Sequence, residues 1–388
     1  MSTGVPTLKG PAYPAARKVA GRVEARFARL AEAALAAAKR NLAPVPDAAT
    51  VEAVIDAAFW ASLRREEGYA PKISLAYLPP EQADPSLKFA RPLPLTATAL
   101  ARLAPAVERP GIHLGVWRCG EGGEFCVWGT TRAIPRLCFV LEVVEPGLLV
   151  VKYRRGRDPS KFANVVVLHG EEVKVVDEGG ASQPDCPGMV TSLLGFGTAS
   201  AQSDHVDVLV QLAVSMRAHA RGGTLLVVPA GSDAWRESIL WNAAYTLEPA
   251  FPELREVLAR CEAEGDDPEW QETLRRAVEA VAGLTAVDGA AVLNDRSELL
   301  AFGAKIVQSR SGSEVERVIV TEPVAGSEPA VVDPAELGGT RHLSAAQFTQ
   351  DQRDTIALVA SQDGRFTVFA WSPCENMVHA HRVETLLL

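Results

Sequence analysis

The stretch from Lys72 to Asp177 limits the possible folds more than any other part of the chain. It consists of short β-branched runs separated by Gly or Pro, namely ISLAYL, IHLGVW, EFCVWG, LCFVLEVV, LLVVKYR, ANVVVLHG and EVKVVD. Each run has the length of one strand, and Gly and Pro are typical of the turns between strands. The sequence therefore predicts an antiparallel β-rich domain over 69–185, with one short helix that begins after Pro94.

The residues before this stretch indicate helices over 1–68. Ala15–Asn41 is Ala-rich, with apolar residues at near-helical spacing and a basic outer face. This helix should end before Pro44, because proline cannot continue it. A second helix is expected over Ala49–Glu66, capped by Asp47 or Thr50.

The C-terminal half alternates helix and strand patterns, which predicts an α/β (α+β) domain over 195–375. The expectation is a mixed sheet with helices on both faces. The Gly/Pro/Ser-rich segment Glu178–Pro187 is the best candidate for the domain boundary. A helical insertion is expected over 233–283, and the helices predicted within it are Ala234–Tyr245, Pro252–Glu264 and Pro268–Gly283.

Composition and charge exclude several functions. The 388 residues carry a formal net charge of -9, which disfavours broad nucleic-acid binding because phosphate contacts need a concentrated basic surface. The basic run Lys152–Arg157 is interpreted as a solvated turn between strands. No window is apolar enough for a membrane helix, and the N-terminus lacks the apolar core of a secretory signal. The six cysteines show no metal-ligand spacing, so we expect reduced, mostly buried thiols in a cytoplasmic protein.

Three segments after Gly283 carry possible chemistry. Asp288 stands beside Gly289, where a carboxylate could meet a ribose or a metal ion. Gly338–His342 opens a helix with backbone N–H groups, a hydroxyl and a guanidinium, and the start of a helix favours an anion. Ser361–Gly364 forms a turn between two strands. Each segment alone also fits an ordinary turn or helix cap.

The order of these segments resembles the diadenylate cyclase domain, which joins two ATP molecules into cyclic di-AMP. The similarity covers 206–371 and rests on four sequences in order: HARGGTLLVVPAG, AVDGAAVLNDRSELLAFGAKI, GTRHLSA and TIALVASQDGRFTVFA. The chain also resembles the predicted sensor family labelled DACNV, proposed to detect nucleotides in bacterial signalling or defence. There the similarity includes the N-terminal region, through PLPLTATALARLAP, LGVW, VWG and EPGLLVVKYR.

The resemblance implies roles for individual residues. Asp288, Gly289 and Ala290 would contact the sugar and base of a nucleotide, and Asp288 would also be the metal ligand if Mg²⁺ or Mn²⁺ accompanies it. Gly339, Thr340, Arg341 and His342 would hold the phosphates. Ser361 and Asp363 would lie close to the nucleotide.

One departure from the family pattern decides the functional interpretation. The family's RHR reads Arg341-His342-Leu343 here, and leucine cannot donate a hydrogen bond to phosphate. Because binding needs fewer groups than catalysis, a damaged motif with a retained pocket indicates a non-catalytic sensor of a purine nucleotide or cyclic dinucleotide. An active diadenylate cyclase and a scaffold with a closed pocket remain the alternatives. An effector protein of unknown identity is expected, and a homodimer is possible.

Two further patterns are weak. His379-x-His381 has no third ligand at metal-binding spacing. Gly195–Ser200 looks faintly like a phosphate loop but lacks its Lys-Ser/Thr ending, so it is interpreted as a flexible connection.

Overall fold

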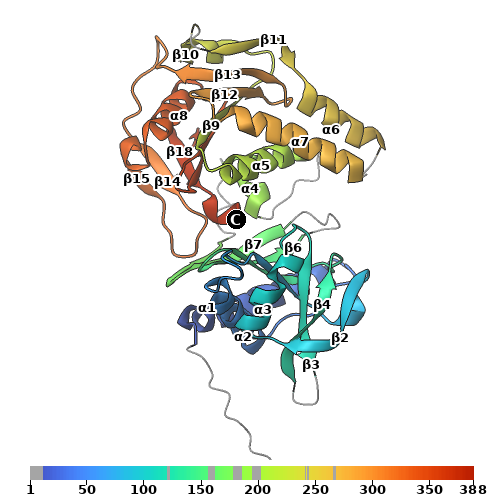
Figure 1. Cartoon of the computed structure of the whole chain (residues 1–388). Helices are drawn as coiled ribbons and strands as arrows, with labels where there is room; N and C mark the ends of the chain where they lie inside the picture. The colour runs from blue at the N-terminus through green and yellow to red at the C-terminus, as the bar shows by residue number, and fades with distance from the viewer. Residues whose placement is uncertain are drawn as a thin grey trace, which may run out of the picture. The chain divides into compact units, whose positions relative to one another are not determined.

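The computed structural model describes residues 12–119, 123–155, 162–177, 186–194, 202–240, 242, 244–264 and 268–388. The chain divides after Val176 into two compact units, unit 1 and unit 2. Each unit is built on one sheet with helices packed against it (Figure 1). The α/β class expected from the sequence is confirmed, since both sheets are mixed and both carry helices.

Unit 1 begins with two helices and continues as a sheet. Its helices are α1 (Pro14–Ala36), α2 (Ala48–Ser62) and α3 (Ala97–Leu103). Its strands are β1 (Ile73–Tyr77), β2 (Ser86–Pro94), β3 (His113–Cys119), β4 (Glu124–Thr131), β5 (Phe139–Glu145), β6 (Leu148–Arg154), β7 (Phe162–His169) and β8 (Glu172–Val175). The strand order is β2-β4-β3-β1-β5-β6-β7-β8, and the pairing is antiparallel except between β1 and β3.

The helices of unit 1 cover one face of this sheet. Val23 and Phe27 of α1 are fully buried, and Phe27 lies against the ring of Phe139 on β5, with centroids 5.6 Å apart. The α2 helix begins where the Asp47 carboxylate accepts a hydrogen bond from the Thr50 amide at 2.7 Å, which satisfies one otherwise free helix N–H. The helices expected over 1–68 thus share one hydrophobic core with the sheet.

The opposite face of the unit 1 sheet combines a small apolar cluster with a buried polar row. Because side chains alternate along a strand, Leu75, Leu141 and Val151 point to the helical core while their neighbours point away from it. Those neighbours include Ser74 and Lys152. Lys152 belongs to the basic run 152–157, so its interpretation as part of a solvated turn is wrong: its side chain is 11% exposed and lies within β6.

A disulfide joins Cys119 and Cys126, which corrects the expectation that every cysteine is reduced. The two residues end β3 and begin β4, and antiparallel pairing of these strands brings their Cα atoms to 5.9 Å. Sequence spacing alone did not reveal this pairing. Outside the disulfide, the cysteines whose side chains are described match the expectation of mostly buried thiols only in part, since Cys138 is buried, Cys186 is half-buried and Cys374 is exposed.

Unit 2 contains the remaining elements. Its helices are α4 (Gly188–Leu194), α5 (Gln202–Ala218), α6 (Glu253–Glu264), α7 (Pro268–Leu284) and α8 (Thr340–Asp351). Its strands are β9 (Gly223–Val228), β10 (Ile239–Leu240), β11 (Tyr245–Phe251), β12 (Ala290–Asn294), β13 (Leu299–Ile306), β14 (Val318–Thr321), β15 (Ala330–Val332), β16 (Ile356–Ala360), β17 (Phe366–Ser372) and β18 (Met377–Arg382).

The unit 2 sheet runs β10-β13-β12-β9-β16-β17-β18-β14-β15, with β11 also paired to β13. Helix α8 packs on one face, where Phe348 is buried among residues of β9, β16 and β17. Helices α5 and α7 lie together on the other face (Figure 1). The buried strand β9 lies inside the sheet, between β12 and β16. Residues that precede or follow these three strands at the same end of the sheet are therefore close together.

One helix expected from the sequence does not form. The helix expected over Ala234–Tyr245 is a short 3-10 helix, Ala234–Ser238, followed by β10, because its apolar residues Trp235 and Ile239 join the sheet core. The helices α6 and α7 form as expected. The candidate loop Gly195–Ser200 and most of the expected boundary segment, 178–185, lie outside the described residues.

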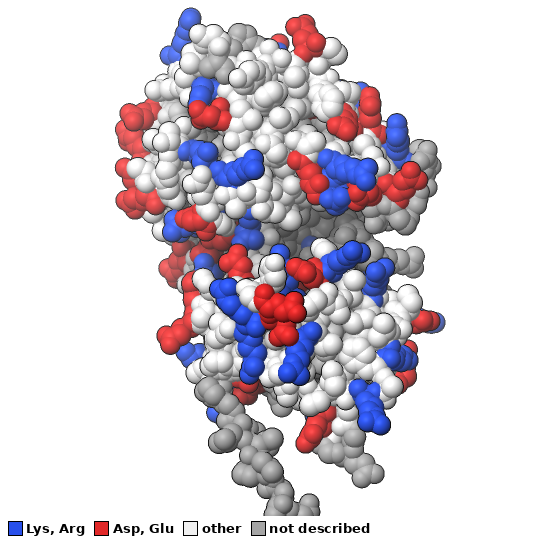
Figure 2. All heavy atoms as spheres, viewed as in Figure 1, with Lys and Arg blue, Asp and Glu red and all other residues white. Residues whose placement is uncertain are grey.

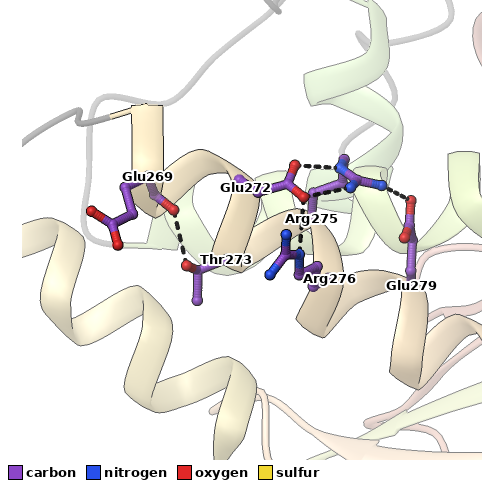
Figure 3. A network of polar contacts seen from close by, with 6 residues as sticks. All are labelled: Glu269, Glu272, Thr273, Arg275, Arg276 and Glu279. Carbon is purple, nitrogen blue, oxygen red and sulfur yellow. Dashed lines mark hydrogen bonds and ion pairs between the residues drawn. The ribbon is translucent and has the colours of Figure 1, made fainter.

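The outer face of α7 carries a network of charged side chains (Figure 3). Glu272 binds Arg275 and Arg276, and Arg275 also binds Glu279, all at helical spacings of three or four residues. These groups are exposed to solvent and pair with one another, so they support the helix and offer no free charge to a ligand.

Among the described residues, no helix has both the length and the hydropathy needed to cross a membrane.

Candidate functional site

The three segments singled out in the sequence meet at one end of the unit 2 sheet. Gly223, the first residue of β9, pairs with Ala360, the last residue of β16. Ala290, the first residue of β12, pairs with Thr224 of β9 and with Ala304 near the end of β13. The residues just beyond these pairs therefore gather at the same end, which we call the basic end. It comprises Arg221–Gly222, Asp288–Ala290, Lys305, Gly339–His342 and Ser361–Asp363.

Helix α8 brings Arg341 to the basic end. The helix begins at Thr340, and its N-cap is Gly339, which has no side chain to accept from the free amides of the first turn. The guanidinium of Arg341 lies over Gly222: a Cβ at Gly222 would come within 2.9 Å of Arg341 Nη1. Gly339, Thr340 and Arg341 are all exposed. Free amides, a hydroxyl and a guanidinium thus face solvent together, an arrangement suited to an anion.

Asp288 is paired with a lysine that the sequence pattern did not single out. Its carboxylate Oδ2 lies 2.5 Å from Nζ of Lys305 on β13, and the Asp288 side chain is 91% exposed. The hydrogen bond and charge of Lys305 lower the pKa of Asp288, and the charge of Arg341 contributes in the same direction. Arg341 and Lys305 therefore both act on this carboxylate, although they stand on different elements, α8 and β13.

Position 289 has no room for a side chain, because the backbone of β13 passes very close to Gly289. A Cβ at Gly289 would lie 2.5 Å from the carbonyl carbon of Gly303, and its φ of +118° disfavours other residues. Gly303 in turn lies under the ring of Tyr245, whose Cδ2 would be 2.9 Å from a Cβ there. Tyr245 stacks on Phe302 with ring centroids 5.0 Å apart and remains 61% exposed. Ala290 is buried and begins β12.

His342 points into the protein instead of toward solvent. Its side chain is buried, its ring meets Phe369 edge-on, and its Nε2 has no hydrogen-bond partner among the described residues. Burial lowers the pKa of His342, and the charges of Arg382, Arg365 and Arg341 lower it further against the opposite effect of Asp363. His342 thus lies buried beneath the basic end, and the phosphate contact that the resemblance implies for it stays a prediction.

Ser361 and Asp363 lie in the turn between β16 and β17. Asp363 forms an ion pair with Arg365 at 3.3 Å. Partial desolvation raises the pKa of Asp363, but hydrogen bonds from Ser361 and from the Arg365 amide, with the charge of Arg365, outweigh it and leave the pKa lowered. The turn is joined to the start of β9 by a hydrogen bond from Gln362 Nε2 to the Arg221 carbonyl at 3.3 Å.

Further cations surround these segments. Arg217 at the end of α5 donates to the Gly364 carbonyl at 3.2 Å, and Arg382 ends β18 opposite Thr367. The face of the molecule drawn in Figure 2 mixes Lys and Arg with Asp and Glu and shows no broad field of one sign. A local group of cations favours a small anionic ligand over a long nucleic acid.

The described residues offer no evident metal centre. No three His, Cys, Asp or Glu side chains among them lie close enough together to hold a metal ion. His379 and His381 are neighbours on the same face of β18, with ring centroids 5.6 Å apart, and both are buried. His381 Nδ1 lies 2.8 Å from the Thr321 hydroxyl, and burial lowers the pKa of His381 to about 4.

Sequence reasoning missed Lys305, Tyr245 and Gly222. Lys305 stands within the AVDGAAVLNDRSELLAFGAKI segment, and a lysine in an otherwise apolar strand was the available signal. Gly222 stands within HARGGTLLVVPAG, where paired glycines before a strand indicate close approach of another chain segment. Nothing in the sequence indicated that Tyr245 belongs to the site, because the surrounding pattern predicted that it ends a helix, whereas it begins β11.

Comparison with known families concerns unit 1. Residues 40–132 match the model of a family described as "probable sensor domain DACNV". The matched segment runs from just after α1 to the end of β4 and lies wholly within unit 1, so it does not include the basic end of unit 2. No curated protein matches the chain. Over residues 40–132, about a quarter of its length, the chain is therefore similar to the DACNV family, which is described as a probable sensor domain.

Proposed function

We propose that the basic end of unit 2 binds a purine nucleotide or cyclic dinucleotide without converting it, and that the chain is a sensor of that ligand. The observation that carries this proposal is the meeting of Arg341, Asp288 and the 361–363 turn at one end of one sheet. These segments are far apart in the sequence. The DACNV match supports the sensor part of the proposal.

The phosphate groups belong at the start of α8. Arg341 provides bidentate donors, the amides of Thr340 and Arg341 have no carbonyl partner within the helix, and the helix dipole favours negative charge there. Gly222 leaves room for the guanidinium, because any side chain there would displace it. A Cβ at Gly339 would meet no atom within 4 Å, so the approach to these amides is open.

The base belongs against Tyr245. Its exposed ring stacks on Phe302 and lies directly over Gly303, which is in close contact with Gly289. An aromatic ring that is fixed on one face and free on the other is a suitable platform for a purine. In the strand order β9-β12-β13, with β11 paired to β13, Asp288–Gly289 at the start of β12 stands between Gly222, where Arg341 lies, and Tyr245.

The arrangement disfavours catalysis. Leu343 is exposed in the first turn of α8 and cannot stabilise charge on a transferred phosphoryl group. Asp288, the candidate for activating a hydroxyl, is occupied by Lys305. A scaffold with a closed site is also disfavoured, since Thr340, Arg341 and Asp288 are exposed.

The test is calorimetric titration of the whole chain with ATP, GTP, cyclic di-AMP and cyclic di-GMP in Mg²⁺ buffer, followed by mass spectrometry of each mixture. We expect one of these ligands to bind and to be recovered intact. Arg341→Ala should weaken binding about 10- to 100-fold, because a charge-assisted hydrogen bond is lost. Arg296→Ala is the matched control, an exposed arginine in the turn after β12 at the opposite end of that strand.

Three outcomes would change the proposal. Conversion of ATP to cyclic di-AMP, abolished by Asp288→Asn, would establish an active cyclase. Equal affinity of the Arg341→Ala and Arg296→Ala proteins for the bound ligand would remove the phosphate assignment. Absence of heat with every nucleotide would favour the scaffold. If the sensor proposal holds, its signal is expected to reach an effector protein or a second copy of the chain, in signalling or defence, and light scattering with and without ligand tests the second copy.

A further inference from the structure

The positive charge next to Asp288 comes from a protein side chain, the ammonium of Lys305. The resemblance to diadenylate cyclases implies instead that Mg²⁺ or Mn²⁺ binds at this carboxylate. Divalent cations of this kind take six oxygen ligands in octahedral geometry, from one or two carboxylates together with water and substrate phosphates. In the structure, Lys305 Nζ lies 2.5 Å from Asp288 Oδ2, which is a direct ion pair.

The rest of the basic end also does not fit a divalent cation. No cluster of three metal-ligating side chains occurs among the described residues. Asp363, the second carboxylate of the basic end, is paired with Arg365 at 3.3 Å. Arg341 lies near enough to act on Asp288 through its charge. A metal ion at Asp288 would therefore meet an ammonium at contact distance and a guanidinium nearby, and both would repel it.

Lys305 is firmly placed for this contact. It lies on β13 two residues after Gly303, whose positive φ of +64° belongs to an irregularity in the pairing of β13 with β12. Its backbone is paired on the other side with Leu240 of β10. The ammonium has three donors, of which Asp288 takes one, and the side chain is 42% exposed. Two donors can therefore reach oxygen atoms of a ligand that arrives from solvent.

We propose that the Lys305 ammonium takes the place of a divalent cation, so that unit 2 binds its anionic ligand without metal. The claim that Lys305 contributes to ligand binding rests on the proposed function. The claim that no metal ion binds at Asp288 rests on the Asp288–Lys305 ion pair alone. Lys305 holds the Asp288 carboxylate in position and supplies one positive charge to the phosphates, alongside Arg341.

The first experiment uses Mn²⁺ alone and needs no nucleotide. Electron paramagnetic resonance of free Mn²⁺ is measured against increasing concentrations of the whole chain. We expect no saturable binding that depends on Asp288 in the wild-type protein. Lys305→Glu, which places two carboxylates together, should bind Mn²⁺ at least about tenfold more tightly. Tight binding of Mn²⁺ by the wild-type protein that Asp288→Asn removes would overturn the proposal.

The second experiment uses ATP as the probe, in EDTA and in Mg²⁺. The wild-type affinity should be the same within about a factor of two in the two buffers. Lys305→Met should weaken binding in EDTA about tenfold, and Lys305→Arg should retain it, because the positive charge remains. Lys174→Met is the matched control, since Lys174 is paired with Glu172 in unit 1.

The two proposals can fail separately. Loss of wild-type ATP binding in EDTA, with binding in Mg²⁺, would retain the nucleotide site and overturn the role of Lys305. Absence of ATP binding in both buffers would count against ATP as the ligand, while the Mn²⁺ measurement still decides whether Lys305 excludes the metal.

Discussion

The two sheets of this protein use charged side chains in opposite ways. In unit 1, the Lys152 ammonium lies 2.5 Å from Glu142 Oε2 and 4.6 Å from the centre of the Phe162 ring, and its side chain is mostly buried. Beside this pair, Ser74 Oγ lies 2.7 Å from Nδ1 of the buried His113. In unit 2, Asp288, Lys305 and Arg341 project beyond the ends of strands and are exposed to a much greater degree.

This difference indicates different roles for the two groups. Charges on the face of a sheet that is largely withdrawn from water must find partners within the protein, and those of unit 1 do so. Charges at the ends of strands lose little hydration and can keep donors available to a ligand. We therefore expect substitutions in the unit 1 row to change stability, and substitutions at the basic end to change binding.

The largest effect is expected from Lys152→Met. It leaves Glu142 without its cation, and loss of one partner from a buried pair costs roughly 3–5 kcal/mol. The Glu142 side chain is 30% exposed, which places the expected loss of unfolding free energy near the lower end, about 3 kcal/mol. Urea unfolding measures this loss. Lys174→Met, which breaks the longer and more exposed pair with Glu172, should cost at most about 1 kcal/mol.

A second substitution makes the Lys152 test sharper. Lys152→Met combined with Glu142→Leu removes both charges and should recover most of the lost stability. Equal stability of the Lys152→Met and wild-type proteins would contradict the view that the unit 1 row is a structural network.

The next effect is a loss of stability in acid. Burial lowers the pKa of His113 from 6.5 to about 4, with Glu142 opposing the shift and Lys152 and Arg154 adding to it. Below pH 6.5 the unfolded chain takes up a proton that folded His113 does not, so stability falls as the pH drops from 6.5 to about 4. The expected loss reaches about 3 kcal/mol at the lower limit.

Hydrogen exchange at several pH values can separate the units. His113→Gln should reduce the pH dependence of protection in β3. Protection in β18 should keep its own dependence, because His381 also has a pKa lowered to about 4. Unchanged pH dependence in β3 of the variant would show that another group is responsible.

The smallest effect concerns two exposed tyrosines, one in each unit. Tyr245→Ala removes the proposed stacking platform and should weaken binding of the purine ligand about 5- to 30-fold, with little change in stability. Tyr69→Ala in unit 1, where the side chain is 79% exposed, should change neither. Calorimetric titration of the two variants measures the difference. Equal affinities would place the base elsewhere.

Much of the fold was predictable because its signals are local. Seven strands of the 72–177 stretch, the helix start at Thr340 and the capping residue Asp47 form as expected from hydrophobic spacing, glycine and hydrogen-bonding side chains. The strand β2 in the same stretch was not predicted. The helix expected over 234–245 failed because the sheet core takes up Trp235 and Ile239, and tertiary packing overrides local propensity. The strand β18 was not predicted, because its two histidines interrupt the apolar run that a buried strand usually shows.

By itself the sequence determined the classes of the elements, the residues available for a site and the resemblance that pointed to Asp288 and Arg341. Only the tertiary structure decided which of them meet. The register of β9 with β12 and β16 brings Asp288 and the 361–363 turn to one end of a sheet. The packing of α8 brings Arg341 there and turns His342 inward, and β13 sets Lys305 against Asp288. Strand pairing and helix packing act between residues distant in the chain, so spacing along the sequence does not encode these contacts.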